Sequence, residues 1–201
     1  MADIVYFYAG KVYLNLTNEC PCRCTFCIRK NGDSVGDAET LWHKKAPSLE
    51  EIKKAIDEYD FRGTNEVVVC GYGEPVCALE NLTATCRYIK EKYGYSIRLN
   101  TNGLGNLIWG RDVVDEVCEY IDSISISLNA PDAEKYNAVT QPKFGLKSFD
   151  AMLSFAEECK KRMDDVRFSV VDVIPEEDIE ACKKLAESMS IPLRVREYTA
   201  D

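Results

Sequence analysis

The chain has 201 residues and a formal net charge of −9, with 34 acidic and 25 basic side chains. This length suits one domain of moderate size, and a hydrophobic content of 46% is sufficient for a core. The acidic balance argues against direct nucleic-acid binding, which requires a basic surface. The sequence has no apolar run of about 18 residues and no basic, then apolar, N-terminal stretch, so we expect neither a membrane span nor a secretory signal.

The ten cysteines are distributed in a way that argues against a disulfide scaffold. Four fall within residues 20–27, and the other six are scattered singly. Several of the scattered cysteines occupy apolar helix faces, where a free thiol acts as a small hydrophobe. This pattern is typical of a reducing compartment, and we expect a cytoplasmic protein.

Strand-like and helix-like segments alternate along the chain, which predicts βα units and a mainly parallel sheet. A capping box formed by Ser48 and Glu51 predicts one helix start, Gly94 predicts a helix end, and Pro175 suits the first turn of the last helix. The expected strands are residues 12–17, 66–70, 96–100, 123–128, 166–173 and 192–198. The expected helices are marked by residues 49–59, 82–94, 114–121, 149–156 and 175–186.

Six such repeats fit either an open sheet or a curved partial barrel. In both architectures ligands bind at the carboxyl ends of the parallel strands. No linker or low-complexity tract interrupts the pattern, so we expect a single domain.

The most informative motif is the loop Cys-Pro-Cys-Arg-Cys-Thr-Phe-Cys at residues 20–27. It contains the spacing Cys20-x3-Cys24-x2-Cys27, and three thiolates at this spacing can hold one face of an iron–sulfur cube. The fourth iron is then left without a protein ligand. A structural zinc site is the alternative, but zinc prefers four closed ligands, usually in two separated pairs.

Polar and glycine-rich motifs follow three of the expected strands. In Gly71-Tyr72-Gly73-Glu74 the glycines allow close approach of a ligand, and Glu74 also suits the N-terminus of a helix. Residues 100–102 and 127–129 place further polar side chains at strand ends, where they could equally begin a turn.

With an aromatic residue just before its last Cys, the loop at 20–27 resembles the cluster loop of the radical S-adenosylmethionine superfamily. From about residue 4 to its end, the chain is similar to short TatD-associated radical S-adenosylmethionine proteins. This similarity rests on the Cys loop and on the stretches 71–75, 100–103, 125–133 and 195–198. The resemblance implies an α/β fold, a partial (β/α)6 TIM-type barrel with mainly parallel strands. It also implies that residues 1–201 form one core domain without a C-terminal auxiliary-cluster domain.

The resemblance further implies an oxidoreductase-type enzyme with a [4Fe–4S] cluster on Cys20, Cys24 and Cys27, while Cys22 is not a ligand. S-adenosylmethionine would chelate the open iron and be cleaved reductively to methionine and a 5′-deoxyadenosyl radical, which abstracts hydrogen from an unknown substrate. No catalytic side chain beyond the cluster ligands is implied. Tyr72 departs from the family's usual Gly-Gly-Glu. The implied cofactor-binding residues are Phe26, Gly71, Tyr72, Gly73, Glu74, Asn102, Ser127, Asn129 and Val171.

The same resemblance suggests a functional link to a TatD-type hydrolase and a flavodoxin- or ferredoxin-like electron donor. Two other functions stay open: an iron–sulfur electron carrier or adaptor for a TatD-type hydrolase, and a compact enzyme such as a glycyl-radical activase or a deazapurine-type synthase. A basic cluster around the Cys loop is either a solvated loop or a docking patch for an acidic donor. It consists of Arg23, Arg29, Lys30, Lys44 and Lys45.

Two further segments carry hypotheses. Residues 30–47 are expected to form a lid, with glycines as hinges and Leu41-Trp42 as an apolar tip. On the last strand, Arg194 or Arg196 is expected either to face the site and pair with a carboxylate or to form a surface ion pair. His43, the single histidine, receives no role.

Overall fold

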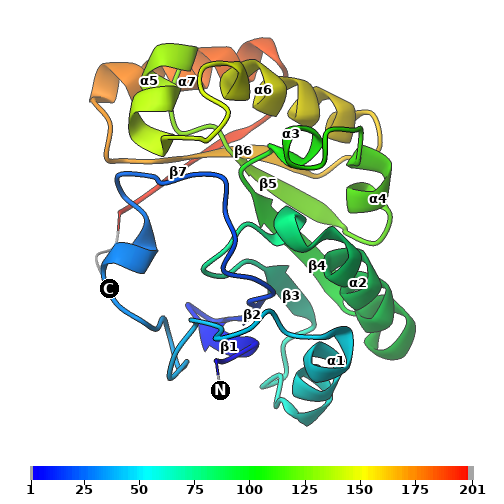
Figure 1. The fold of residues 1–201 in the computed structure, drawn as a ribbon. Helices are drawn as coiled ribbons and strands as arrows, with labels where there is room; N and C mark the ends of the chain where they lie inside the picture. The colour runs from blue at the N-terminus through cyan, green and yellow to red at the C-terminus, as the bar shows by residue number, and fades with distance from the viewer. Residues whose placement is uncertain (1, 199–201) are drawn as a thin grey trace.

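The computed structural model describes residues 2–198. Its seven strands form a single curved sheet in the order β1 to β7 (Figure 1). The strands β2 to β7 run parallel to one another, as the alternating pattern predicts. The strands are β1 (Val5–Tyr8), β2 (Lys11–Leu14), β3 (Glu66–Val69), β4 (Ser96–Thr101), β5 (Ser123–Ser127), β6 (Val166–Val171) and β7 (Leu193–Arg196).

Strand β1 is an element that the sequence reasoning missed. It pairs antiparallel with β2 and places Tyr6 opposite Tyr13. The connecting turn has two residues, Ala9 and Gly10, with φ of 46° and 78°. Positive φ at both positions is the geometry of tight hairpins. The aromatic and β-branched run at residues 5–8 followed by Ala-Gly was the available signal, although it is weaker than Asn-Gly.

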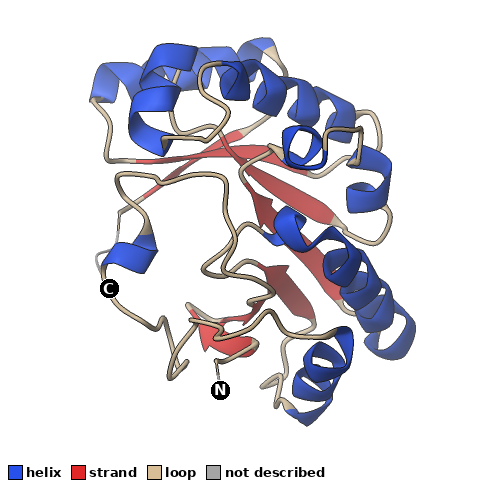
Figure 2. Cartoon of the chain, viewed as in Figure 1, coloured by secondary structure: helices blue, strands red, loops and turns tan. Residues whose placement is uncertain are grey.

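The α-helices all lie on the outer, convex side of the sheet (Figures 1 and 2). This arrangement buries the outward-facing aliphatic side chains of the strands, such as Val67, Leu99 and Ile124, each with 0% exposure. Within residues 2–198, the inner, concave side carries no α-helix, only the Cys loop and the short 3-10 helix at residues 28–30 that follows it. The helical elements are η1 (Ile28–Lys30), α1 (Leu49–Glu58), η2 (Pro75–Ala78), α2 (Leu79–Tyr93), α3 (Gly105–Trp109), α4 (Val114–Cys118), α5 (Ala133–Thr140), α6 (Lys147–Lys160) and α7 (Glu176–Ser188).

The predicted helix boundaries are largely confirmed. Ser48 accepts a hydrogen bond from the Glu51 N–H and Glu51 returns one to Ser48, which is the expected capping box of α1. Gly94 ends α2 in the left-handed conformation, with φ of 66°. Pro175 lies one residue earlier than predicted, at the N-cap of α7.

Other boundaries differ from the prediction. The first parallel strand ends at Leu14 rather than at residue 17, because the chain beyond it turns towards the Cys loop. The fifth predicted strand ends at Val171 rather than at residue 173. The short helices α3 and α5 were not predicted, since five or eight residues give too little periodicity. Within residues 2–198, none of the helices combines the length and apolar character that a membrane crossing requires.

Candidate functional site

A cavity of about 280 Å³ lies at the carboxyl edge of the parallel strands. Its wall contains residues from the Cys loop and from the segments that follow β3, β4, β5 and β6. All twelve predicted site residues line it: Cys20, Cys24, Phe26, Cys27, Gly71, Tyr72, Gly73, Glu74, Asn102, Ser127, Asn129 and Val171. The expectation that the carboxyl ends of parallel strands meet at one edge of the sheet therefore predicted that these residues lie together.

The Cys loop crosses the concave side and is tied at both sides by backbone hydrogen bonds (Figure 1). At one side, the Glu74 N–H donates to the Glu19 carbonyl at 2.7 Å. At the other, the Arg23 and Thr25 N–H groups donate to carbonyls at the end of α5, at 3.0 and 2.8 Å. The loop thus spans from β3 to α5 and covers the inner face of the sheet.

The four thiols of the loop differ in burial. Cys20, Cys24 and Cys27 are half-buried, whereas Cys22 is 3% exposed and belongs to the main hydrophobic core. Interaction with the neighbouring Cys22 thiol lowers the pKa of Cys20 and of Cys24. Interaction with these two thiols, together with burial, raises the pKa of Cys22. The loop therefore favours thiolates at two predicted ligand positions and a neutral thiol at Cys22.

This donor set fits an iron–sulfur cluster better than a single ion. Within residues 2–198, no three Cys, His, Asp or Glu side chains converge on one metal-ion position. A cluster does not require such convergence, because each thiolate binds a different iron. Three half-buried sulfurs along one wall of a cavity meet that requirement.

Arg29 belongs to the site rather than to the basic surface predicted around the loop. Its Nε lies 3.4 Å from the Cys27 sulfur, and its Nη1 donates to the Asn18 carbonyl at 3.1 Å. The guanidinium also lies over the ring of Trp42, 5.6 Å from its centroid. A fixed positive charge beside the thiols stabilises their ionised forms, and it contributes to the lowered pKa of Cys20.

Gly71 and Gly73 are needed for a reason that the sequence did not show. A Cβ at Gly71 would lie 2.3 Å from the Asn15 side-chain oxygen, and one at Gly73 would lie 2.2 Å from the Thr17 carbonyl oxygen. The close approach is therefore between two segments of the chain itself. The glycines let the turn after β3 contact the start of the Cys loop.

Tyr72 holds the segment after the Cys loop in place. Its side chain is 4% exposed, and its hydroxyl donates to the Gly32 carbonyl at 2.8 Å and lies 3.3 Å from the Ser34 carbonyl oxygen. Its ring meets Trp42 edge-on, with centroids 5.1 Å apart. The residue that departs from the family's Gly-Gly-Glu is thus an anchor.

The lid predicted at residues 30–47 does not have the expected apolar tip. Leu41 is 1% exposed and packs with Tyr6, Val35 and Tyr72 in a second hydrophobic cluster. Its carbonyl accepts a hydrogen bond from the buried Asn15 amide at 2.8 Å. Burial of Leu41 makes this segment a packed part of the wall. His43, assigned no role, contacts the Asn15 carbonyl through Nε2 at 2.9 Å.

Glu74 is buried, and groups of the chain itself satisfy most of the hydrogen-bonding capacity of its carboxylate. It accepts hydrogen bonds from the Thr101 hydroxyl at 2.6 Å, from the Asn102 N–H at 2.7 Å and from the Val76 N–H at 3.2 Å. Burial raises its pKa to about 7, with a further contribution from Cys20, although the hydrogen bonds oppose the rise. The Val76 contact is the helix-start interaction predicted as the alternative role.

The polar residues at the ends of β4 and β5 also combine two roles. Asn102 accepts from the Leu104 N–H at 2.9 Å, which forms a turn, while its amide lies 3.8 Å from the Cys22 sulfur. Asn129 is buried and has φ of 57°, a conformation that Asn tolerates better than most residues. Ser127 ends β5 half-buried at the cavity.

Sequence reasoning missed one wall of the cavity, formed by Tyr6, Tyr8 and Tyr13 of the β1–β2 hairpin. The rings of Tyr6 and Tyr13 stack with centroids 5.3 Å apart. Recognition of the hairpin would have shown these side chains on one face, since alternate residues share a face. Of the two arginines on β7, Arg196 lines the cavity.

The sequence model of the Radical SAM superfamily matches residues 14–189. The chain belongs to the radical SAM superfamily. Members of this superfamily bind a [4Fe–4S] cluster and S-adenosylmethionine, which confirms the predicted cofactors at the level of the family.

Among curated proteins, the chain is 27% identical over 144 residues to the GTP 3′,8-cyclase of Corynebacterium glutamicum strain R. The match covers 66% of this chain and 34% of that protein. The radical SAM chain described here therefore spans about a third of the length of this relative.

Solved structures share the fold at low sequence identity. Methylornithine synthase (PylB) has a TM-score of 0.66 and 15% identity over 98% of this chain and 55% of that chain. Native anSMEcpe with bound AdoMet has a TM-score of 0.61 and 18% identity, over 93% and 50% of the two chains. A radical SAM methyltransferase from Sphaerobacter thermophilus has a TM-score of 0.55 and 15% identity, over 96% and 68%. The predicted partial TIM-type barrel is thus confirmed.

Substitution Gly73→Ala tests the contact between the turn after β3 and the Cys loop. The new Cβ would lie 2.2 Å from the Thr17 carbonyl oxygen and 2.7 Å from that of Glu19, both backbone atoms. We expect the free energy of unfolding in urea to fall by about 1–3 kcal/mol, the usual cost of overpacking. Gly32→Ala is the matched control, because nothing lies within 4 Å of its Cβ position. Equal stability of the two variants would contradict this view of the turn.

Glu74 should make the stability of the iron-free protein depend on pH. Its pKa of about 7 in the folded chain exceeds the ordinary value of 4.5, so the folded chain keeps a proton that the unfolded chain releases. This contribution is complete below about pH 4.5 and is lost as pH rises to about 7, a loss of about 3 kcal/mol. Urea unfolding at several pH values measures it. Glu74→Gln cannot titrate, and parallel pH profiles for variant and parent would refute the assignment.

Proposed function

We propose that this chain is a radical SAM enzyme that reductively cleaves S-adenosylmethionine at a [4Fe–4S] cluster and uses the nucleoside fragment to abstract hydrogen from a substrate. The observation that carries the proposal is the common cavity of all twelve predicted residues, in a chain of this family. The bound cofactors would supply the electron transfer and the hydrogen abstraction. The protein would supply binding, orientation and exclusion of water.

Cys20, Cys24 and Cys27 would hold the cluster, since they are the half-buried thiols of the Cys loop and all three line the cavity. The buried Cys22 would keep its proton and orient the thiolates on either side. Arg29 would offset part of the negative charge of the cluster through its contact with the Cys27 sulfur. These roles need no general acid or base.

The remaining predicted residues would surround S-adenosylmethionine. The turn 71–74 is fixed by its contact with Thr17 and Glu19, so its backbone presents a rigid edge to the cavity. Buried Glu74 would fix Asn102 through its backbone N–H. Ser127, Asn129 and Val171 line the opposite part of the wall. Rigid positioning of this kind lowers the entropic cost of reaching a reactive geometry.

Anaerobic reconstitution tests the proposal directly. The reconstituted protein, given S-adenosylmethionine and dithionite, is expected to form 5′-deoxyadenosine, detected by mass spectrometry. Alanine at Cys20, Cys24 or Cys27 should abolish both bound iron and product, while Cys22→Ala should keep both within a few-fold. Far-UV circular dichroism checks the fold of each variant.

A different outcome would favour the iron–sulfur carrier. A brown protein that forms no 5′-deoxyadenosine, and that loses its cluster on Cys22→Ala, would show four thiolate ligands. This result would contradict the proposed enzyme activity and would support an electron carrier whose cluster has a thiolate on every iron.

We also propose that an acidic flavodoxin- or ferredoxin-like donor docks beside the Cys loop. Arg23, Lys30, Lys44 and Lys45 are exposed there. The Lys143 N–H bonds to the Pro21 carbonyl at 2.8 Å and brings a fifth exposed cation to this surface. Complementary charge raises the rate of encounter and makes it dependent on salt. A link to a TatD-type hydrolase and a cytoplasmic location remain predictions.

Charge reversal at Arg23 and Lys30 tests this docking surface. With reduced flavodoxin as donor, the double variant R23E/K30E should form 5′-deoxyadenosine about tenfold more slowly at low salt, since like charges repel. With dithionite, the two proteins should react at similar rates. The matched control is K183E/K184E on α7. An equal loss with dithionite would mean that the substitutions damage the cluster site instead.

A further inference from the structure

The inner face of the sheet forms the floor of the barrel, and no α-helix of the described residues packs on it (Figures 1 and 2). Several of its inward positions are polar. The registers place the side chains of Arg98, Ser123, Ser125 and Arg167 on one face, because paired residues of neighbouring strands point the same way. The alternate positions, such as Ile124, are fully buried against the helices. A polar face that no α-helix packs against is available to a ligand in the cavity between the sheet and the Cys loop.

Cations dominate this inner face in a chain whose net charge is −9. Five basic side chains and one acid occupy its inward positions: Lys11, Glu66, Arg98, Arg167, Arg194 and Arg196. Low-dielectric walls focus the field of such a group towards the space they enclose. The inner face is therefore positive where the molecule as a whole is negative.

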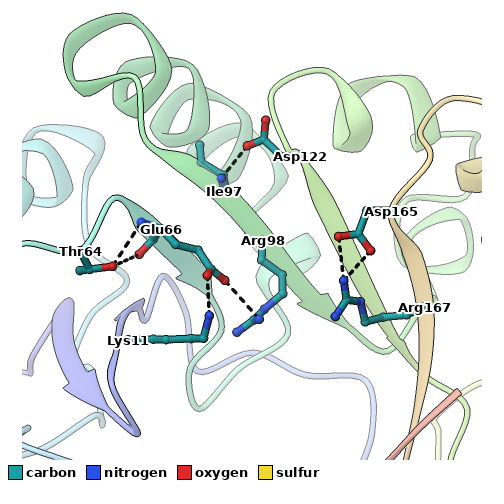
Figure 3. A network of polar contacts seen from close by, with 8 residues as sticks. All are labelled: Lys11, Thr64, Glu66, Ile97, Arg98, Asp122, Asp165 and Arg167. Atoms are coloured by element: carbon teal, nitrogen blue, oxygen red, sulfur yellow. Dashed lines mark hydrogen bonds and ion pairs between the residues drawn. The ribbon is translucent and has the colours of Figure 1, made fainter. Parts of the chain in front are cut away.

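The ion pairs on this face leave positive charge uncompensated. Figure 3 shows Glu66 between Lys11 and Arg98, with an Arg98 Nη1 to Glu66 Oε1 distance of 3.2 Å. One carboxylate thus serves two cations. Arg167 uses Asp165, whose two oxygens lie 2.5 and 2.7 Å from its Nη2.

On the last strand, neither Arg194 nor Arg196 has an ion-pair partner within residues 2–198. The surface ion pair suggested from the sequence for one of these arginines is therefore not seen among the described residues. Arg196 lines the cavity and lies beside Val171 in the register.

Arg98 and Arg196 belong to the same inner face. Arg98 lies two residues before Asn100 on β4, so their side chains share a face, and Asn100 lines the cavity together with Arg196. Arg98 is only 13% exposed, and Glu66 is its one ion-pair partner among the described residues. A guanidinium has five donors, so most of those on Arg98 remain for a ligand.

Small side chains occupy the strands that lie between these two arginines in the sheet. The inward positions of β5 are Ser123, Ser125 and Ser127, and Ser169 lies beside Ser127 on β6. Serine hydroxyls can donate hydrogen bonds to an oxyanion and occupy little space. The floor of the barrel thus combines small side chains, neutral donors and cations.

We propose that the substrate carries an anionic group, a phosphate or a carboxylate, which the inner face binds through Arg196 and Arg98. This inference rests on the proposed function, because it names the substrate class of that same site. Guanidinium groups bind both oxyanions through paired hydrogen bonds. With its anion held on the floor, the rest of the substrate would extend towards the Cys loop above it.

Isothermal titration of the reconstituted protein, saturated with S-adenosylmethionine, tests the proposal with pyrophosphate and citrate as separate probes. The saturated protein is used so that the carboxylate of the cofactor is already bound. We expect at least one probe to bind, and Arg196→Gln and Arg98→Gln each to weaken it roughly tenfold or more. Arg87→Gln on α2, exposed and paired with Glu91, is the matched control and should bind as the parent does. Preference for one probe distinguishes phosphate from carboxylate.

Absence of binding by the parent protein, or equal binding by Arg196→Gln, would overturn the proposal. It would also be overturned if Arg196→Gln weakened S-adenosylmethionine binding in the absence of any probe, since the guanidinium would then serve the cofactor. Formation of 5′-deoxyadenosine in the same samples reports separately on the proposed function. Anion binding without this product would contradict the enzyme activity while leaving the anion site standing.

Discussion

The site depends on one contact between two stretches of backbone, residues 17–19 and 71–74. Gly73 lies against the Thr17 carbonyl, and the Glu74 N–H binds the Glu19 carbonyl at 2.7 Å. Because this contact tolerates no Cβ, it fixes the distance between the Cys loop and the sheet. The thiols, the turn after β3 and the buried carboxylate of Glu74 all take their positions from it.

The same contact explains why buried polar groups are tolerated here. Asn15 is fully buried, yet its oxygen accepts the Tyr72 N–H at 3.1 Å and its amide donates to the Leu41 carbonyl at 2.8 Å. The carboxylate of Glu74 likewise accepts hydrogen bonds from three donors. Satisfied buried groups of this kind hold a site rigidly, whereas unsatisfied ones would destabilise it.

The order of the parallel strands and the gathering of the site could be predicted, because apolar runs such as 66–70 end in glycine or polar residues. What the sequence could not show arises from tertiary packing. The role of Gly71 and Gly73 depends on a loop fifty residues away in the chain, and the burial of Leu41 depends on Tyr72. The β1–β2 hairpin was missed because Ala9 rather than Asn opens its turn.

The buried thiol of Cys22 has a consequence for the assembly of the metal centre. Because it lowers the pKa of Cys20 and of Cys24, iron displaces fewer protons from these thiols than from ordinary ones, and its uptake depends less steeply on acidity. Thiolates are also the forms that are oxidised most readily and that attack disulfides. The arrangement that eases loading therefore makes the loop sensitive to air until iron is bound.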